Sequence, residues 1–428
     1  MGEKSQKEVK DFNNQANVEL MAPVGSFESM MAAINAGCDS IFFGITQLNM
    51  RAKSSQNFNF DDLQKISETC RDHGVKTYLT LNTVLYDHDL KLAYKIIDEA
   101  KKNKIDAVII SDMAAILYAN KIGQPVHLST QVSVSNIEMV KFYAQYCEMI
   151  VLARELTLPM VKNICQQIKE QNIKGTDGEL IKIEIFGHGA ICIAVSGRCQ
   201  MSLLTDNSSA NRGACTQNCR REYVVTEVDT NTQLKLENNY VMSPTDLCTI
   251  GLMDELVATG ITTLKIEGRG RSAHYVDTVI SCYKEALDAV AEGSYSQEKI
   301  DSWNKRLGTV YNRGMSDSFY MGQPFVKWSG AHGNKATLRR EYVGLVSNYF
   351  VKAQVVEVEV LNGSLSNDDE YLFTGQTTGL MKGSQPVMWL DGKEVSAAAK
   401  GDLITFKISE RVRRGDRLYK LVDNEVDK

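Results

Sequence analysis

Short runs of apolar, often β-branched residues alternate with longer segments of helical period from about residue 18 to residue 292. Between the runs, apolar residues recur three and four positions apart, as in Met30, Met31 and Ile34, which indicates helices. The runs predict eight strands, at 18–23, 40–44, 76–82, 106–111, 126–131, 149–154, 181–187 and 262–268. Polar residues suited to N-caps stand where helices would begin, at Ser26, Asp61, Asn136, Thr157 and Ser272.

The predicted strands read as continuous apolar runs, which is typical of parallel strands buried on both faces. Eight strand and helix units therefore predict an α/β fold, a TIM-like (β/α)8 barrel over residues 18–295. A doubly wound open sheet is the alternative. That fold usually has fewer repeats and a glycine-rich phosphate loop after its first strand, where this chain has only APVGSFES.

The spacing of the barrel units breaks once, because about 75 residues separate Gly187 from Thr262. We assign residues 188–245 to a cysteine-rich insertion after strand seven. Residues 1–17 form a polar tail, and residues 296–340 form a connecting segment. From 341 to 428 the pattern changes to short alternating strands punctuated by Gly, Asn and Asp, which predicts a small antiparallel β-barrel domain.

The composition of the 428 residues, 43% hydrophobic and 24% charged, is that of a soluble globular chain and excludes disordered, collagen-like and coiled-coil proteins. The first residues lack the apolar core of a signal peptide, and no apolar run approaches the length of a membrane span. We therefore expect a cytoplasmic protein with no membrane partner. The net charge of −5 does not indicate a broad nucleic-acid-coating surface, but it leaves room for a local basic site.

Ten cysteines are unusual for a chain expected in a reducing compartment, where clustered cysteines bind metals or act in catalysis. Four of them in the insertion are spaced C-x6-C-x15-C-x3-C: Cys192, Cys199, Cys215 and Cys219. Thiolates bind zinc or an iron–sulfur cluster. Structural zinc usually takes two closely spaced pairs of cysteines, and only the second pair, Cys215 and Cys219, has that spacing. The spacing favours the cluster, with zinc as the alternative.

Cys248, in SPTDLC at the predicted start of a helix, is a fifth candidate that would replace one of the four ligands. Its alternative interpretation is a small buried residue on the helix face. The remaining cysteines lie on predicted helical segments away from the insertion and are expected in the core: Cys38, Cys70, Cys147, Cys165 and Cys282.

Polar side chains follow the predicted strand ends, where the catalytic groups of a barrel converge. The catalytic candidates are His188, Glu155, Glu267 and Arg269. Guanidinium groups suit carboxylate or phosphate recognition, and amides add hydrogen bonds. The substrate-binding candidates are Arg154, Arg198, Arg212, Gln131 and Asn82. For each residue, a purely structural ion pair or hydrogen bond is the alternative.

Five long motifs, FGHGAIC, SGRCQMS, SANRGACTQNCRREY, SPTDLC and LKIEGRGRSAHYV, together resemble the collagenase-like peptidase family U32. The resemblance runs from about Met21 through the barrel, and the C-terminal region looks like the small β-barrel attached in many members. Members include proteins required for hydroxylation of wobble uridine in tRNA, of cytidine in ribosomal RNA, and of ubiquinone without oxygen.

The resemblance implies a [4Fe–4S] cluster on Cys192, Cys199, Cys215 and Cys219, with Cys248 as the alternative ligand. It also implies prephenate as the hydroxyl source in the RNA-modifying branch, and a second family member as a partner in some cases. We therefore expect an enzyme that hydroxylates a pyrimidine base in tRNA or rRNA, since such bases are reached in single-stranded loops.

Two other functions stay open. A collagenase-like peptidase is one, although the chain has no H-E-x-x-H zinc site and no G-x-S-x-G nucleophile elbow. A Cys192–His188 pair would serve a peptidase only if the thiolate were not bound to iron. The other is a non-enzymatic RNA-binding protein stabilised by zinc.

Overall fold

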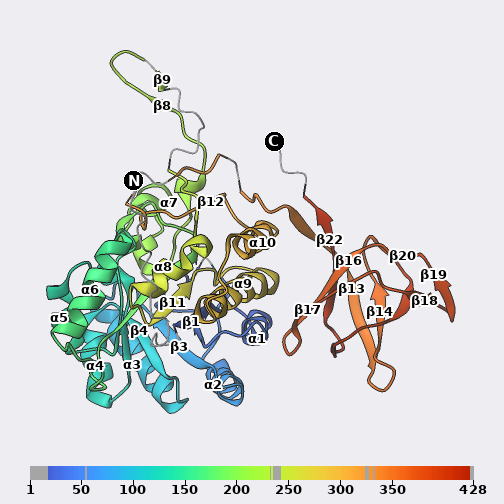
Figure 1. The fold of residues 1–428 in the computed structure, drawn as a ribbon, viewed down its shortest axis with the longest axis horizontal. Helices are drawn as coiled ribbons and strands as arrows, with labels where there is room; N and C mark the ends of the chain where they lie inside the picture. Colours follow the sequence, from blue (N-terminus) through green and yellow to red (C-terminus); the bar gives the residue numbers. More distant parts are fainter. Residues whose placement is uncertain are drawn as a thin grey trace, which may run out of the picture.

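The computed structural model describes residues 18–53, 55–231, 233–234, 242–322, 327–330 and 333–424. The predicted polar tail, residues 1–17, lies outside the described residues. Figure 1 shows a helix-covered barrel beside a C-terminal domain of strands, and a hairpin of β8 (Val225–Thr226) and β9 (Gln233–Leu234) that projects from the barrel. No helix in this described part is long and apolar enough to cross a membrane.

Eight parallel strands form a closed ring. Each pairs with its neighbour in the chain, and the last strand, β11, pairs with both β7 and β1. The ring consists of β1 (Glu19–Pro23), β2 (Ser40–Phe43), β3 (Lys76–Leu81), β4 (Ala107–Ile110), β5 (Val126–Leu128), β6 (Met149–Val151), β7 (Lys182–Gly189) and β11 (Thr263–Ile266). All eight predicted strands are confirmed, and closure of the ring excludes the open doubly wound sheet.

Helices cover the outside of the ring (Figure 1). They are α1 (Phe27–Asn35), α2 (Asp62–Asp72), α3 (Asp87–Lys102), α4 (Met113–Ile122), α5 (Ile137–Ala144), α6 (Leu158–Glu170), α8 (Met253–Ala258) and α9 (Ala273–Ala291). All five predicted N-cap residues directly precede a helix. Ser26, Asn136 and Ser272 accept the capping hydrogen bond from a backbone N–H, whereas the side chains of Asp61 and Thr157 make none.

The segment between β7 and β10 (Asp246–Cys248) contains α7 (Met201–Asp206) and short 3-10 turns, at Val195–Gly197, Ala210–Arg212 and Asn218–Arg220. Cys248 lies in β10, so the prediction that it starts a helix is wrong. β10 pairs antiparallel with the end of β7, with Cys248 opposite His188, and this pairing holds the backbone extended. A 3-10 turn (Ile250–Leu252) and α8 follow only afterwards.

The five scattered cysteines are buried, as predicted. Cys70, Cys165 and Cys282 lie on helices, but Cys38 and Cys147 lie in the turns after α1 and α5, so their helical assignment is wrong. Helix α1 ends at Asn35, and Gly37 then takes a positive φ of 86°, a common way to terminate a helix.

Helix α10 (Gln297–Gly308) and β12 (Met315–Ser316) lie within the predicted connecting segment. The C-terminal domain that follows is antiparallel, as predicted. It consists of β13 (Leu338–Phe350), β14 (Val355–Val360), β15 (Ser364–Ser366), β16 (Glu370–Gly375), β17 (Gly379–Ser384), β18 (Met388–Leu390), β19 (Lys393–Val395), β20 (Ala397–Ala399), β21 (Leu403–Lys407) and β22 (Arg417–Asp423). Its main sheet has the order β17-β16-β22-β13-β14-β21-β18-β19 among the described strands. The domain has its own apolar core.

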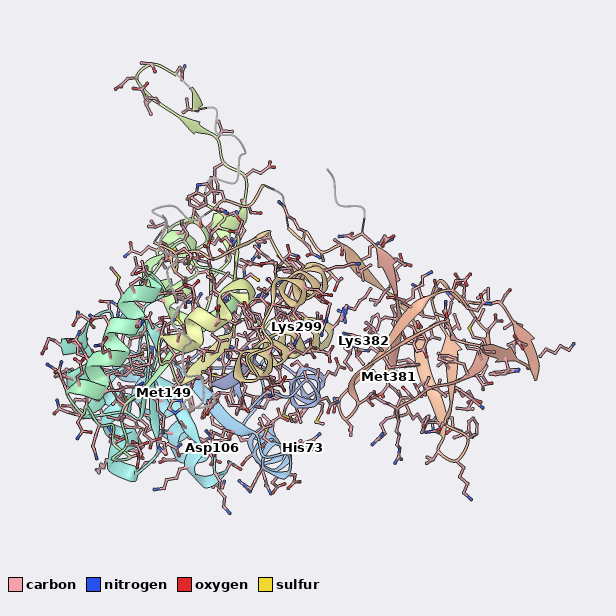
Figure 2. All side chains as sticks on the ribbon, viewed as in Figure 1. His73, Asp106, Met149, Lys299, Met381 and Lys382 are labelled. Atoms are coloured by element: carbon pink, nitrogen blue, oxygen red, sulfur yellow. The ribbon has the colours of Figure 1, made fainter. Side chains whose placement is uncertain are left out.

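The C-terminal domain packs against α1 and α9 through β17. Lys382 Nζ lies 2.7 Å from Asp277 Oδ2, at the boundary between the two domains (Figure 2). Beside this ion pair, Ala32 and Leu380 belong to one small apolar cluster. Gly379 has a φ of 70°, and a Cβ added there would lie 2.7 Å from the backbone nitrogen of Ala32. The close approach of the domains therefore requires a glycine at this position.

We predict that Gly379→Ala destabilises the docked domain by about 1–3 kcal/mol, because backbone atoms cannot move aside. Gly392→Ala is the matched control, since Gly392 also has a positive φ (77°) but no atom within 4 Å of its added Cβ. Thermal unfolding and limited proteolysis measure the difference. Equal losses of stability in the two variants would show that the contact between Gly379 and α1 does not stabilise the docked domain.

Candidate active site

A cavity of about 340 Å³ opens at the carboxyl ends of the barrel strands, where barrel enzymes carry out their chemistry. Its lining comes from the barrel strands and the loops that follow them, from the insertion, and from the segment after α10. Ten of the predicted site residues line it: Asn82, Gln131, Arg154, Glu155, Cys192, Cys199, Cys215, Cys219, Glu267 and Arg269.

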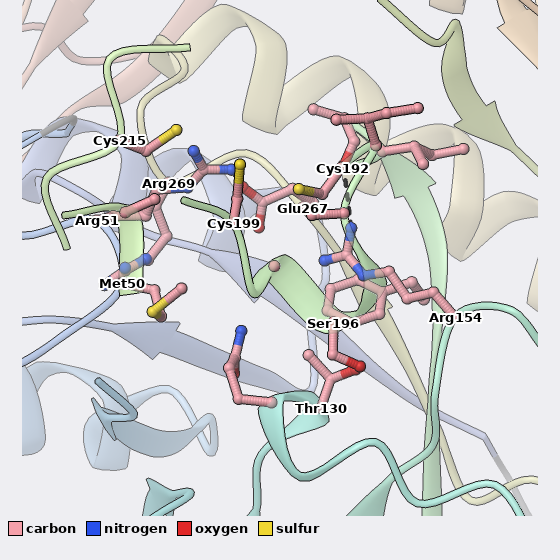
Figure 3. Close-up of a pocket in the computed structure, with 18 of the residues that line it drawn as sticks. Met50, Arg51, Thr130, Arg154, Cys192, Ser196, Cys199, Cys215, Glu267 and Arg269 are labelled. Carbon is pink, nitrogen blue, oxygen red and sulfur yellow. Dashed lines mark hydrogen bonds and ion pairs between the residues drawn. The ribbon is translucent and has the colours of Figure 1, made fainter. Parts of the chain in front are cut away.

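The four predicted ligand cysteines face this one cavity. Figure 3 shows Cys192, Cys199 and Cys215 on the side of the cavity where Glu267 and Arg269 lie. Burial raises the pKa of the Cys219 thiol, and the nearby Cys192, Cys215 and Cys199 raise it further while Arg220 opposes them. Cys199 Sγ also accepts a 3.3 Å hydrogen bond from the Met201 backbone N–H. The insertion thus brings four sulfur atoms within electrostatic reach of one another.

Cys248, the predicted alternative ligand, is not part of the cavity lining. Burial raises the pKa of its thiol, and its sulfur lies 3.9 Å from the Tyr283 hydroxyl oxygen. The structure therefore separates Cys248 from the other four cysteines of the segment.

The cysteines of the cavity are donors that either of the two predicted metal groups could use. Among the described residues, no three His, Cys, Asp or Glu side chains are grouped around a single metal-ion position. Zinc needs four donors around one ion. In a four-iron cluster each thiolate binds its own iron, so its ligands stand further apart. The four thiols that face the cavity match a four-iron cluster in donor type and number.

Three guanidinium groups surround Glu267. Arg51 Nη2 lies 2.9 Å from Glu267 Oε1. The positive charges of Arg154 and Arg269 also stabilise the ionised form of this carboxylate. Burial opposes ionisation of Glu267, but the three arginines outweigh it and lower its pKa. Glu267 is therefore ionised at neutral pH, which suits an anchor for the arginines rather than a general acid.

This arginine cage (Arg51, Arg154 and Arg269) is held rigidly. The Arg154 guanidinium lies 3.6 Å from the centre of the Phe186 ring and donates to the carbonyl of Ala190. Arg269 donates to Thr80 and Asn49, and burial lowers its pKa to about 10. With one carboxylate among three cations, the cage has an excess of two positive charges and is suited to binding anions.

Another part of the lining is polar and neutral apart from Glu155. Asn82 Nδ2 donates to Gln131 Oε1 at 3.1 Å and to Ser129 Oγ at 3.2 Å. Glu155 Oε1 accepts a long, 3.4 Å hydrogen bond from the backbone N–H of Ser196. These amides fix each other's orientation and leave further donor and acceptor positions toward the cavity.

His188, a predicted catalytic residue, does not line the main cavity. It is buried, its Nδ1 lies 3.3 Å from the Tyr283 hydroxyl, and burial lowers its pKa to about 3. It lines a small neighbouring cavity whose lining does not include Cys192. The structure therefore places a neutral His188 apart from the cysteine that a Cys–His nucleophile would need.

Arg198 and Arg212, predicted to bind substrate, also lie outside the lining. Arg198 donates to the Gln131 carbonyl at 2.7 Å, and Arg212 forms an ion pair with Asp89, with its two nitrogens 2.6 and 3.1 Å from the carboxylate oxygens. Arg220, which does line the cavity, donates to the backbone carbonyls of Ile191 and Pro244. Arg198 and Arg212 therefore anchor the insertion to the barrel, whereas the partners of Arg220 lie within the insertion.

Several cavity residues were not among the predicted site residues, including Arg51, Lys265, Arg271, Tyr311 and Arg313. Arg51 and Arg271 lie in loops after β2 and β11, so the rule that found Arg154 would also have found them. Lys265 is buried within β11, with Nζ 2.8 Å from Glu184 Oε1. Tyr311 and Arg313 belong to the segment interpreted only as a connector, where no strand pattern points to a site.

A closed β/α barrel with a charged cavity at the carboxyl ends of its strands is the architecture of a barrel enzyme. The family model "Peptidase family U32" matches residues 25–330, and the chain belongs to this family.

Relatives of this chain carry names of two kinds. A protein named collagenase, from Porphyromonas gingivalis, is 48% identical over 412 residues, which cover 96% of this chain and 100% of the relative. The tRNA hydroxylation protein P of Helicobacter pylori is 31% identical over 319 residues, 72% of each chain. A 23S rRNA 5-hydroxycytidine synthase of Escherichia coli is 32% identical over 276 residues, which cover 64% of this chain and 40% of the relative.

The ion pair between Arg212 and Asp89 makes the anchoring of the insertion dependent on pH. The hydrogen bonds from Arg212 lower the pKa of Asp89 to about 2 in the folded protein, from 3.8. A lowered carboxyl pKa stabilises the fold above about pH 4, and this stabilisation is lost as the pH falls toward 2. We predict that Asp89→Asn costs about 2 kcal/mol at pH 7, and that its difference from wild type disappears at about pH 2.

Urea denaturation at several pH values measures this difference. Asp87→Asn, at an exposed position of the same helical turn, is the control and should have little effect. A loss of stability in Asp89→Asn that is equally large at pH 2 and pH 7 would contradict the electrostatic explanation.

Proposed function

We propose that the protein hydroxylates a pyrimidine base in tRNA or rRNA, with prephenate as the oxygen donor and a [4Fe–4S] cluster on Cys192, Cys199, Cys215 and Cys219. One observation carries the proposal: the four cysteines and the arginine cage line the same cavity at the barrel mouth. The relatives named for tRNA and rRNA hydroxylation support the choice of substrate.

The cavity residues have distinct roles in this proposal. The excess positive charge of the arginine cage binds an anionic oxygen donor, and the two carboxylates of prephenate match guanidinium groups. Cys192, Cys199, Cys215 and Cys219 would hold the cluster, which would supply electron transfer. The amides of Asn82 and Gln131 offer hydrogen bonds to the polar edge of a pyrimidine that has left its stack.

The proton and electron balance constrains the reaction. Replacing a base C–H by C–OH removes two electrons from the base, and the oxygen donor accepts them. Two carboxylates, Glu155 and Glu267, line the cavity where the base loses its proton, and the three arginines weaken Glu267 as a proton acceptor. Neutral His188, outside the main cavity, takes no part.

The substrate is tested by deleting the gene in its host and analysing the RNA nucleosides by mass spectrometry. We predict that one hydroxylated pyrimidine disappears and that the wild-type gene restores it. A gene that carries Arg154→Gln should restore less than a tenth of the hydroxylated nucleoside, because the arginine cage loses one of its cations. Arg71→Gln, at an exposed position on α2, should restore it fully. Persistence of every hydroxylated pyrimidine in the deletion strain would contradict the proposal.

The ligand set is tested by single substitutions in anaerobically purified protein. We predict that Cys199→Ala and Cys215→Ala each abolish the visible absorbance of the cluster, because a cluster of this type needs its four thiolates. Cys70→Ala, in the core, and Cys248→Ala, outside the cavity lining, should retain it. Loss of absorbance in Cys248→Ala together with its retention in Cys199→Ala would refute the assignment.

A collagenase-like peptidase is the second candidate, because the relative that is 48% identical over nearly the whole chain is named collagenase. The described cavity lining does not include His188, so the Cys192–His188 pair is not assembled there. Cleavage of collagen by the purified protein, together with unchanged RNA nucleosides in the deletion strain, would favour this candidate.

A further inference from the structure

Three residues at one side of the cavity form a cationic stack that the proposed chemistry does not use. The Arg271 guanidinium lies 3.5 Å from the centre of the Tyr311 ring, and the Arg313 guanidinium lies 5.2 Å from the same centre. All three line the cavity. Arg271 follows the last barrel strand, β11, and directly precedes Ser272, the N-cap of α9.

Arg271 differs from the other arginines of the cavity in its partners. Arg51, Arg154, Arg220 and Arg269 each donate to a carboxylate, a carbonyl or a polar side chain. For the Arg271 guanidinium, no hydrogen bond or ion pair occurs within the part of the chain that the structure describes. Its face is held against Tyr311 by a cation–π contact, and its N–H groups are left for a ligand.

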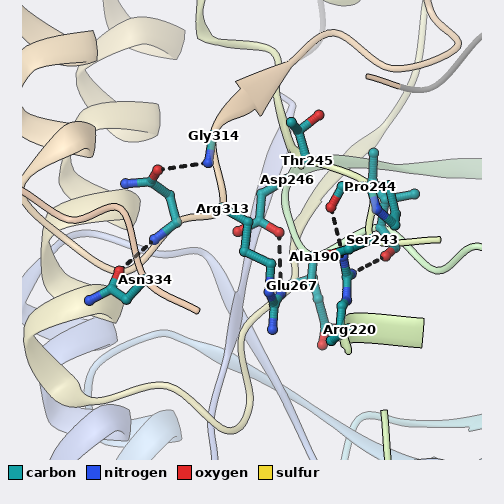
Figure 4. A network of polar contacts seen from close by, with 12 residues as sticks. Ala190, Arg220, Ser243, Pro244, Thr245, Asp246, Glu267, Arg313, Gly314 and Asn334 are labelled. Carbon is teal, nitrogen blue, oxygen red and sulfur yellow. Dashed lines mark hydrogen bonds and ion pairs between the residues drawn. The ribbon is translucent and has the colours of Figure 1, made fainter. Parts of the chain in front are cut away.

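The surroundings of the stack have an excess of positive charge. Arg313 Nη1 lies 3.5 Å from the carboxylate of buried Asp246. The positive charges of Arg220, Arg271 and Arg313 all attract the ionised form of that carboxylate. Figure 4 shows Arg313 directed at Asp246, and Arg220 bonded to Ser243 and Pro244. Burial nevertheless raises the pKa of Asp246. At most one negative charge therefore faces three cations, so at least two positive charges stay uncompensated.

This position is favourable for a phosphate. Barrel proteins frequently bind phosphate at the loops after strands seven and eight, and Arg271 lies in the loop after the eighth strand of this ring. A guanidinium with a fixed plane presents its donors in the fork that matches phosphate oxygens. An RNA strand that delivers a base into the cavity carries a phosphodiester on each side of that nucleotide.

We propose that Arg271, held flat on Tyr311 and assisted by Arg313, binds a phosphodiester of the RNA substrate next to the target nucleotide. This inference rests on the proposed function. It assigns Arg271 and Tyr311 to positioning of the RNA strand, and it leaves the arginine cage around Glu267 to the small anionic oxygen donor.

The test measures RNA binding as a function of salt concentration. Fluorescently labelled, unmodified tRNA transcripts and 23S rRNA fragments are titrated with the anaerobically purified full-length protein at several KCl concentrations. The plot of log K against log [KCl] has a negative slope, and loss of one phosphate contact makes that slope less steep by about 1. We expect Arg271→Gln to show this change and to weaken binding about tenfold at low salt.

Three further variants separate charge from stacking. Arg271→Lys should keep the salt slope but bind more weakly, because lysine keeps the charge and lacks the planar fork. Tyr311→Phe keeps the ring and should behave as wild type, whereas Tyr311→Leu should resemble Arg271→Gln. Arg71→Gln is the matched control. It removes an exposed arginine at the last turn of α2, which precedes β3 and so lies at the end of the barrel away from the cavity.

The outcomes distinguish the two proposals. If the wild-type protein binds RNA and Arg271→Gln has the same slope as Arg71→Gln, the phosphate site is wrong and the proposed function stands. If the wild-type protein binds neither RNA, the proposed function fails and this inference fails with it. Comparable melting temperatures for all variants show that a changed slope does not come from unfolding.

Discussion

Charge balance at the barrel mouth is the constraint on which the rest of the site depends. Buried Arg269 and the partly buried Arg51 and Arg154 surround a single carboxylate, Glu267. Such desolvation is costly unless anionic partners are near. The ionised Glu267 offsets one positive charge. The four neighbouring thiols are the largest other set of side chains in the cavity that can become anionic. A cluster ligated by four thiolates and an anionic substrate would each complete this balance.

The barrel supplies the rigidity that this arrangement needs. Because β11 pairs with both β7 and β1, the loops that carry Arg51, Arg154 and Arg269 start from a closed ring. The insertion is tied to the same ring by Arg198, by the Arg212–Asp89 ion pair, and by a 2.7 Å hydrogen bond between Ser133 and Ser196. The cysteines are therefore held over the mouth by polar contacts to the barrel, since the insertion has little regular structure of its own.

The strands, the N-caps and the grouping of four cysteines were predictable because each leaves a local signal: a continuous apolar run, a polar residue at a helix start, or a short cysteine spacing. The pairing of Arg51 with Glu267 joins residues 216 positions apart and leaves no such signal. The orientation of His188 was also hidden. The pairing of β11 with β7 shifts register between Lys265 and Ile266, opposite Gly187, so strand alternation does not tell which side His188 faces. Tyr311 and Arg313 reach the cavity from a segment without a strand pattern.

The central claim, that this cavity holds an iron–sulfur cluster beside an anion-binding arginine cage, is tested most directly by metal analysis of the wild-type protein. Iron, acid-labile sulfide and zinc are to be measured in the full-length protein purified without oxygen. We expect about four iron atoms and about four sulfides per chain, with little zinc. A colourless protein that contains stoichiometric zinc and no iron would contradict it.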